Sequence, residues 1–203
     1  MHARHTGFTL VELAVVLIII GLLLGGVLQG QELIHGAKAK AVATDFRNVT
    51  TMLAAYQDRF RALPGDDRGA AAQLGATTSG NGNGLIEGTW DSTAPADESA
   101  RAWQHLRLAN LAKGELTPPA PGDWEPHNAD GGRLGLQSTT PFPGMRGRLF
   151  ICQGGLSGRI ARQVDMTLDD GKPDQGAMRF GAALGAAASN VDDDATYVAC
   201  LSA

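Results

Sequence analysis

The chain has 203 residues, a formal net charge of −4, and 19% charged residues. This length accommodates one ordinary domain together with an anchoring helix. The weakly acidic balance provides no basic surface of the kind that nucleic-acid-binding domains carry, so we expect no nucleic-acid partner. With 27 glycines, much of the globular part is expected to be loop.

The N-terminal part predicts a membrane anchor. Residues 1–7 form a short basic leader, and sixteen apolar or glycine residues run from Leu13 to Leu28. A helix over residues 8–30 would span about 34 Å, which matches the roughly 30 Å of hydrocarbon in a bilayer. The basic leader holds the N-terminus on the cytoplasmic side. We therefore expect a single membrane pass over residues 8–30.

One carboxylate, Glu12, lies inside this apolar helix. A charge in a bilayer helix costs roughly 2.5–3.5 kcal/mol on insertion scales, so it is retained only where it has a partner or a role. If the chain is cut between Gly7 and Phe8, the new ammonium of Phe8 lies one helical turn before Glu12. The carboxylate then meets that ammonium in its own chain or in a neighbour displaced along the helix axis.

The segment from Gly7 to Glu12, GFTLVE, resembles the type III signal of type IV pilins and type II secretion pseudopilins. The resemblance implies that a prepilin peptidase cuts after Gly7 and methylates Phe8, and that Glu12 acts in assembly. It also implies a pilin-like α+β fold, with one long N-terminal helix and a small, loop-rich, sheet-bearing head. The resemblance is firm from Gly7 to Phe60, and only general architecture matches beyond.

After the apolar run the pattern becomes amphipathic without a break. Apolar residues recur every three or four positions from Ile34 to Phe60, with Lys38 occupying one of these positions. Pro64 and Gly65 end the pattern. We therefore expect one helix from Phe8 to Ala62, in which residues 31–62 pack on a head formed by residues 63–203.

The first part of the head is expected to be a connector followed by one helix. A short helix is predicted near Gly69–Leu74, and the glycine-rich run 79–87 has Trp90 where a calcium loop needs a bidentate Glu, so we interpret it as a turn. A helix is predicted from Asp97 to Lys113, with Gly114 as its C-cap. We interpret His105, in this helix, as a surface or packing residue.

The second part of the head is expected to contain the strands. Residues 117–143 are dense in proline and glycine and predict a long loop with one short strand near 133–137. Residues 148–152 and 196–201 predict two further strands. Ser157 is expected to cap a short helix that ends at Arg162.

Two cysteines, Cys152 and Cys200, fall in the two strand candidates. In a translocated domain such a pair indicates one disulfide, and two free buried thiols are the alternative. A bridge would tie the two strands together.

The most acidic segment contains four aspartates, Asp165, Asp169, Asp170 and Asp174. One interpretation is a calcium site, because calcium takes six to eight oxygen ligands and the resemblance to secretion pseudopilins implies calcium in the C-terminal part of the head. The other is a solvated loop whose carboxylates pair with Lys172, Arg162 or Arg179. We expect no other cofactor.

No catalytic pattern is found: the sequence lacks the spacings of a zinc protease, a nucleophile elbow and a dinucleotide site. We therefore expect a structural subunit of a type IV pilus or a type II secretion pseudopilus, and no enzyme. Its expected partners are identical or related pilin subunits, prepilin peptidase, the inner-membrane assembly machinery and, before assembly, membrane lipid. It is expected in the bacterial inner membrane with its head in the periplasm, and then in a periplasmic pseudopilus or an extracellular pilus.

The alternative is a monomeric, membrane-anchored periplasmic binding module that uses the same helix. The two interpretations differ in whether Glu12 is required and in whether the mature N-terminus is Phe8.

Overall fold

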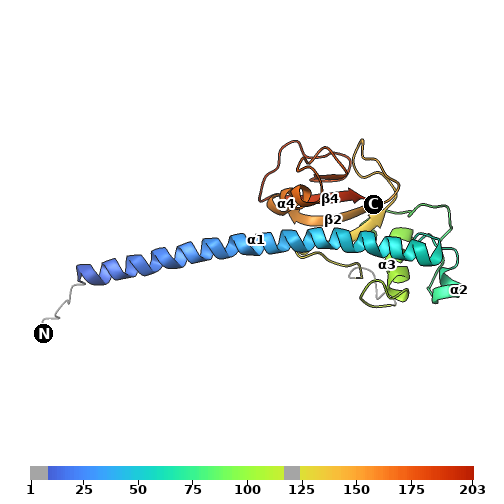
Figure 1. Cartoon of the computed structure of the whole chain (residues 1–203), viewed down its shortest axis with the longest axis horizontal. Helices are drawn as coiled ribbons and strands as arrows, with labels where there is room; N and C mark the ends of the chain where they lie inside the picture. Colours follow the sequence, from blue (N-terminus) through green and yellow to red (C-terminus); the bar gives the residue numbers. More distant parts are fainter. Residues whose placement is uncertain (1–8, 117–123) are drawn as a thin grey trace, which may run out of the picture. The chain divides into compact units, whose positions relative to one another are not determined.

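The computed structural model describes residues 9–116 and 124–203. The chain forms two compact units, Met1–Ala37 and Lys38–Ala203, and one helix, α1 (Leu10–Phe60), begins in the first and ends in the second. The remaining elements all belong to the second unit, which is the head (Figure 1): α2 (Ala70–Leu74), α3 (Glu98–Leu108), β1 (Leu134–Gln137), β2 (Phe150–Ser157), α4 (Gly158–Leu168), β3 (Met178–Gly181) and β4 (Thr196–Ser202).

The predicted long helix is confirmed, since α1 is continuous over 51 residues. Its amphipathic stripe is buried as expected within the head, and its members are Ala39, Val42, Ala43, Phe46, Val49, Leu53 and Tyr56. Lys38, the polar exception in the stripe, places its ammonium 2.9 Å from a carboxylate oxygen of Asp130. The helix ends where Arg61 adopts a left-handed φ of 55°.

The head contains a four-stranded antiparallel sheet with the strand order β1-β2-β4-β3. The C-terminal strand, β4, is therefore central, because it pairs with both β2 and β3. Helix α4 packs against β2, β3 and β4. The fold is α+β, as predicted: a long N-terminal helix packs with its C-terminal part on a small antiparallel sheet (Figure 1).

The main hydrophobic core joins the buried stripe of α1 to the sheet and to α3 and α4. From α3 it includes Trp103 and Leu106, and from β2 it includes Ile151 and Leu156. A second, smaller core surrounds the two cysteines and contains Trp90, Phe142, Met145 and Phe150. Each side chain of this size contributes roughly 1.5–3 kcal/mol when it is fully buried, so the two cores supply most of what holds the head together.

Three sequence predictions for the head are corrected by the structure. Helix α3 ends at Leu108 rather than Lys113, because Asn110 takes a left-handed φ of 60° and the N–H groups of Leu111 and Ala112 turn back to the Leu106 carbonyl. Gly114 is therefore not its C-cap. Helix α4 continues to Leu168, well beyond Arg162, and strand β3 was not predicted at all.

Candidate functional site

The first candidate site lies at the start of α1, where Thr9 and Glu12 bond to each other. A carboxylate oxygen of Glu12 accepts hydrogen bonds from the backbone N–H and the hydroxyl of Thr9, both at 2.8 Å. In return the Glu12 N–H donates to the Thr9 hydroxyl at 3.3 Å. This reciprocal arrangement is a capping box, which satisfies N–H groups that a helix start would leave unpaired. Gly7 and Phe8, the predicted cleavage and methylation residues, lie outside the described residues.

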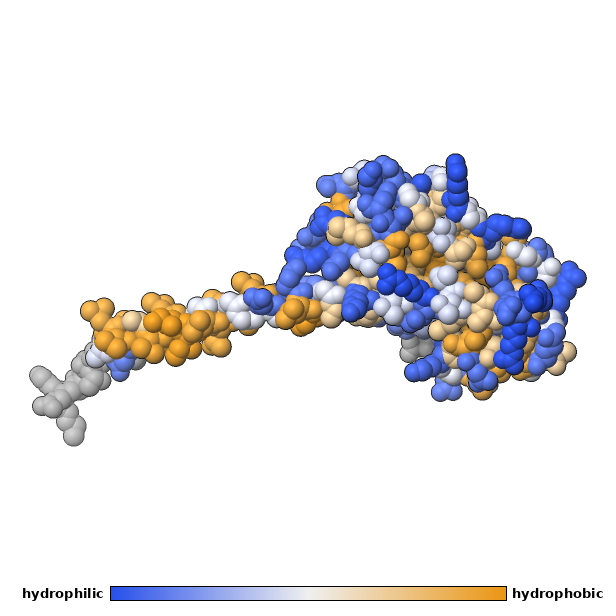
Figure 2. Space-filling model, in the orientation of Figure 1, coloured by the Kyte–Doolittle hydropathy of each residue, from blue (hydrophilic) through white to orange (hydrophobic). Residues whose placement is uncertain are grey.

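The apolar part of α1 is open to its surroundings along its length. Among the described residues, α1 is the one helix that is long and apolar enough to cross a membrane, judged by length and composition, with a mean hydropathy of 2.8 over its most apolar window. Figure 2 shows hydrophobic side chains over the visible face of this segment. A Cβ atom added at any of four glycines in this segment would meet no heavy atom within 4 Å, the nearby backbone of the helix itself aside. These are Gly21, Gly25, Gly26 and Gly30. Glycines so placed allow another helix to approach closely.

The two cysteines form the predicted disulfide. Cys152 in β2 lies directly opposite Cys200 in β4, in the central pair of the sheet, and the two are bridged. Both side chains are fully buried in the second core. The bridge thus fastens the last strand to the strand that packs beside it.

The structure brings together three of the four predicted acidic residues. Carboxylate oxygens of Asp165, Asp169 and Asp170 lie within 4.8 Å of one another, and Asp174 is not part of this group. Asp165 was expected in a loop but lies in the last turn of α4 with its side chain fully buried. Neither of its carboxylate oxygens has a hydrogen-bond partner. Burial and the two neighbouring carboxylates raise the pKa of Asp165 to about 7.

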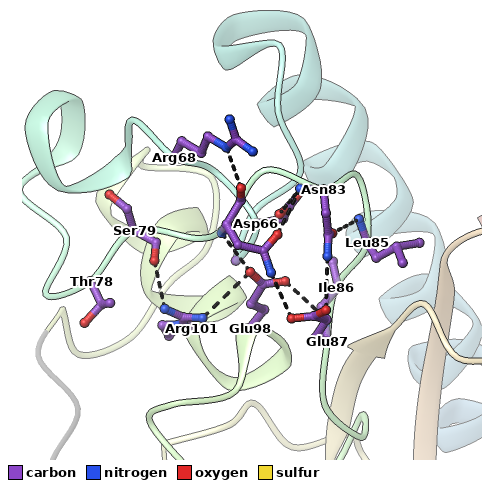
Figure 3. Close-up of polar contacts among 12 residues, drawn as sticks. Asp66, Arg68, Thr78, Ser79, Asn83, Leu85, Ile86, Glu87, Glu98 and Arg101 are labelled. Atoms are coloured by element: carbon purple, nitrogen blue, oxygen red, sulfur yellow. Dashed lines mark hydrogen bonds and ion pairs between the residues drawn. The ribbon is translucent and has the colours of Figure 1, made fainter.

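The glycine-rich run 79–87 is held by two buried carboxylates (Figure 3). Asp66 accepts the backbone N–H groups of Asn83 and Gly84, at 3.0 and 2.8 Å. Glu98 accepts those of Asn81 and Glu87, at 3.0 and 3.2 Å. Because these oxygens accept N–H donors, the run is a clamped turn, consistent with its interpretation from sequence.

A buried histidine, His105, contacts the backbone at Gly65 and at Thr78, just before this glycine-rich run. The Nδ1 atom of His105 accepts the Gly65 N–H at 2.9 Å, and Nε2 faces the Thr78 carbonyl at 3.2 Å, so Nε2 carries the proton of the neutral ring. The ring stacks on Tyr56, whose hydroxyl donates to Asp67 at 2.8 Å. Burial is the main reason that the pKa of His105 lies below its usual value. His105 is therefore a packing residue, and it is wholly internal.

Sequence reasoning did not find the clamp formed by Asp66 and Glu98. Its members are 32 positions apart in the chain, and only the fold brings them to one loop. The available signal was the pair of Asn-Gly steps at 81–84, which required a tightly bonded turn with left-handed φ at Gly82 and Gly84. That signal indicates a turn, but it does not say which side chains hold it.

Comparison with known proteins gives one positive result. Residues 2–28 match the prokaryotic N-terminal methylation motif. Neither the comparison with curated proteins nor the one with solved structures gives a match. The motif includes Gly7, Phe8 and Glu12, the three residues assigned from sequence. The chain thus carries, ahead of an α+β head, the prokaryotic N-terminal methylation motif that is typical of type IV pilins and pseudopilins.

Proposed function

We propose that this protein is a structural subunit of a type IV pilus or a type II secretion pseudopilus. The methylation motif at residues 2–28 carries this proposal. It is supported by the exposed apolar half of α1, which needs either lipid or neighbouring helices around it. On this proposal the protein first spans the inner membrane with its head in the periplasm, and then enters a filament through its N-terminal helix. It acts by assembly and performs no reaction of its own.

The proposed processing has two steps, both at the junction of Gly7 and Phe8. A prepilin peptidase removes residues 1–7, and the new N-terminus is methylated. Intact-mass analysis of the mature full-length product is expected to show a chain that begins with N-methylated Phe8. A mature N-terminus after Ala39, as a conventional signal peptidase would leave, would contradict the proposal. An uncleaved chain that keeps residues 1–7 would favour the anchored binding module.

Glu12 is proposed to set the axial position of each subunit. Within one chain its carboxylate is bonded to Thr9, which keeps the polar groups at the helix start paired. In a bundle of apolar helices an unpaired carboxylate would be costly, whereas the Phe8 ammonium of a neighbour would neutralise it. A subunit therefore fits where its Glu12 reaches such an ammonium.

The assembly role can be separated from the capping role by two substitutions. Glu12→Gln keeps a side chain that completes a capping box but removes the charge. We expect its incorporation into filaments to fall at least about tenfold, on the reasoning that about 1.4 kcal/mol of lost pairing is a factor of ten. Glu32→Ala, on the same helix but beyond the apolar run, is the matched control. Wild-type levels of filament in the Glu12→Gln strain would refute the role of Glu12.

We also propose that a hard cation, with calcium as the candidate, binds at Asp165, Asp169 and Asp170. The supporting observation is that Asp165 is fully buried with both oxygens unpartnered, an arrangement that is unfavourable for a carboxylate alone. A cation with six to eight oxygen ligands would use these oxygens together with nearby carbonyls and water.

Thermal unfolding of the detergent-solubilised full-length protein tests the cation proposal. At pH 8, millimolar calcium is expected to raise the Tm of the wild type and to leave that of Asp165→Asn unchanged. Asp174→Asn, which alters a residue outside the group, is expected to respond as the wild type does. An equal response in the Asp165→Asn protein, or none in the wild type, would exclude the site.

A further inference from the structure

A groove at the C-terminal end of α1 carries exposed arginines. It has a volume of about 840 Å³, and its lining includes three arginines, Arg61, Arg68 and Arg148, and the apolar residues Leu53, Ala54 and Leu149. Arg148 has no hydrogen-bond or ion-pair partner among the described residues. Arg68 donates through Nε to the Asn81 carbonyl and has no carboxylate partner in the same set. These guanidinium groups therefore have donors left for an anionic partner.

The two acidic residues in the groove do not cancel this charge at its rim. Asp66 and Asp67 are both buried. Asp66 is occupied by the N–H groups of Asn83 and Gly84, and Asp67 by the Tyr56 hydroxyl and the Gly69 N–H. The three arginine side chains are exposed. Arg61 is ion-paired with exposed Asp58 at 3.6 Å, whereas Arg68 and Arg148 have no carboxylate partner among the described residues.

An acidic turn lies at the opposite end of the strand that leads to the groove. Residue 203, directly after β4, lines the groove, whereas Asp192, Asp193 and Asp194 directly precede β4. A strand of seven residues is about 20 Å long, and Figure 1 shows β4 beside β2 in the sheet. The head thus has a positive feature and a negative feature at the two ends of one strand.

The acidic turn is held in one conformation, and two of its carboxylates, those of Asp192 and Asp194, have no cationic partner among the described residues. Asp193 forms ion pairs with Arg159 and Arg162, and the Asp192 N–H donates to the Tyr197 hydroxyl at 2.9 Å. Asp192 and Asp194 are both exposed. Because the backbone is already fixed, little ordering is needed when these carboxylates meet a partner.

We propose that the acidic turn of one copy binds in the arginine groove of the next copy in the filament. The contact pairs two different surfaces of the same chain, which is the heterologous kind that builds open helical assemblies. A long polyanion such as nucleic acid fits less well, since the groove lining holds no aromatic residue for stacking and the chain has a net charge of −4. This proposal rests on the proposed assembly function and specifies which parts of neighbouring heads touch.

Charge exchange in the full-length chain, expressed in the bacterium that encodes it, tests the contact. Arg148→Asp and Asp194→Arg are each expected to lower the yield of sheared filaments by about two- to twentyfold, the range for one or two exposed ion pairs and the repulsion that replaces them. The double variant is expected to recover most of the yield. Arg146→Asp is the control, because it reverses an exposed charge two residues away that does not line the groove.

Cross-linking gives a second readout that does not depend on yield. Filaments of the Arg148→Cys/Asp194→Cys double variant are expected to form a ladder of disulfide-linked multimers on mild oxidation, and the Lys113→Cys/Asp194→Cys variant is expected to form none.

Equal ladders in both variants, or no recovery in the charge-exchanged double variant, would overturn the contact. Loss of binding to another anionic protein without loss of filaments would assign the groove to a foreign partner instead. Absence of filaments from the unmodified chain would refute the proposed function, and the contact with it.

Discussion

The side-chain amide of Gln153 in β2 donates a hydrogen bond to the backbone carbonyl of Val42 in α1, at 3.0 Å and 111 positions away in sequence. Gln153 is fully buried, and the oxygen of its side-chain amide has no hydrogen-bond partner. The contact joins the middle strand pair of the sheet to the helix stripe that covers it. Because a hydrogen bond is directional, this contact fixes the position of β2 along α1, whereas apolar packing alone would allow several positions.

Substitutions at Gln153 separate this hydrogen bond from the volume of the side chain. Gln153→Leu removes the bond and the unpaired oxygen together, so we expect the free energy of unfolding to change by no more than about 1 kcal/mol. Gln153→Ala also leaves a cavity and is expected to destabilise by about 2–4 kcal/mol. Denaturant unfolding in detergent measures both, and a larger loss for Leu than for Ala would contradict this account.

Acidification is expected to destabilise the head through His105. Its pKa is lowered in the folded state, mainly by burial, so the unfolded chain takes up a proton first as the pH falls. The stabilisation is therefore complete above the unfolded pKa of about 6.5 and is lost progressively below it. His105→Gln retains an acceptor for Gly65 and a donor for Thr78 without titrating. Unfolding curves between pH 7 and 5 should show a flatter pH dependence for this variant, and an unchanged slope would assign the effect to another group.

Without calcium, Asp165 is expected to lower the stability of the head as the pH rises, which is opposite to the effect of His105. Its pKa is raised to about 7 by burial and by Asp169 and Asp170. The folded state therefore holds a proton that the unfolded chain has released, and stability falls as the pH rises from about 4 to about 7. With a chelator at pH 8, Asp165→Asn is expected to be more stable than the wild type by about 1–4 kcal/mol. A difference that is the same at pH 4 and pH 8 would show that the carboxylate charge is not the cause.

Loss of the disulfide is expected to weaken the head strongly. Cys152 and Cys200 are 48 positions apart, and closing a loop of that length stabilises a fold by about 4 kcal/mol in the chain-entropy account. The Cys152→Ala/Cys200→Ala variant should therefore unfold at markedly lower denaturant concentration than the wild type. An unchanged midpoint would mean that packing in the second core, around Trp90 and Phe150, suffices without the bridge.

The long helix and the two central strands of this fold were predictable because their signals are local. Apolar residues recur every three to four positions from Val42 to Tyr56, which predicts one buried helix face. The apolar runs around Cys152 and Cys200 predict two buried strands. Strand β3 escaped prediction because its residues 178–181 form a short edge strand, whose pairing with β4 comes from tertiary contacts.

The candidate sites likewise fall into those that a local sequence motif predicts and those that depend on long-range packing. Gly7, Phe8 and Glu12 follow from a contiguous motif, and the motif match includes them. The position of Asp165 did not follow from sequence, because Ser157 was expected to begin a helix of only six residues and α4 instead runs on to Leu168. That extension turns Asp165 from a loop residue into a buried one. The arginine groove and the clamp of Asp66 and Glu98 depend on long-range packing, which no local pattern records.

The bridge between β2 and β4 also determines how the head would respond to mechanical tension. The 48 positions between Cys152 and Cys200 correspond to about 160 Å of extended chain, and none of that length can be drawn out while the sulfurs remain joined. A pull between α1 and the C-terminal strand would therefore have to unravel the earlier part of the head, from residue 61 to β2. A fibre made of such subunits would lengthen by a limited amount and then resist further extension through a covalent bond.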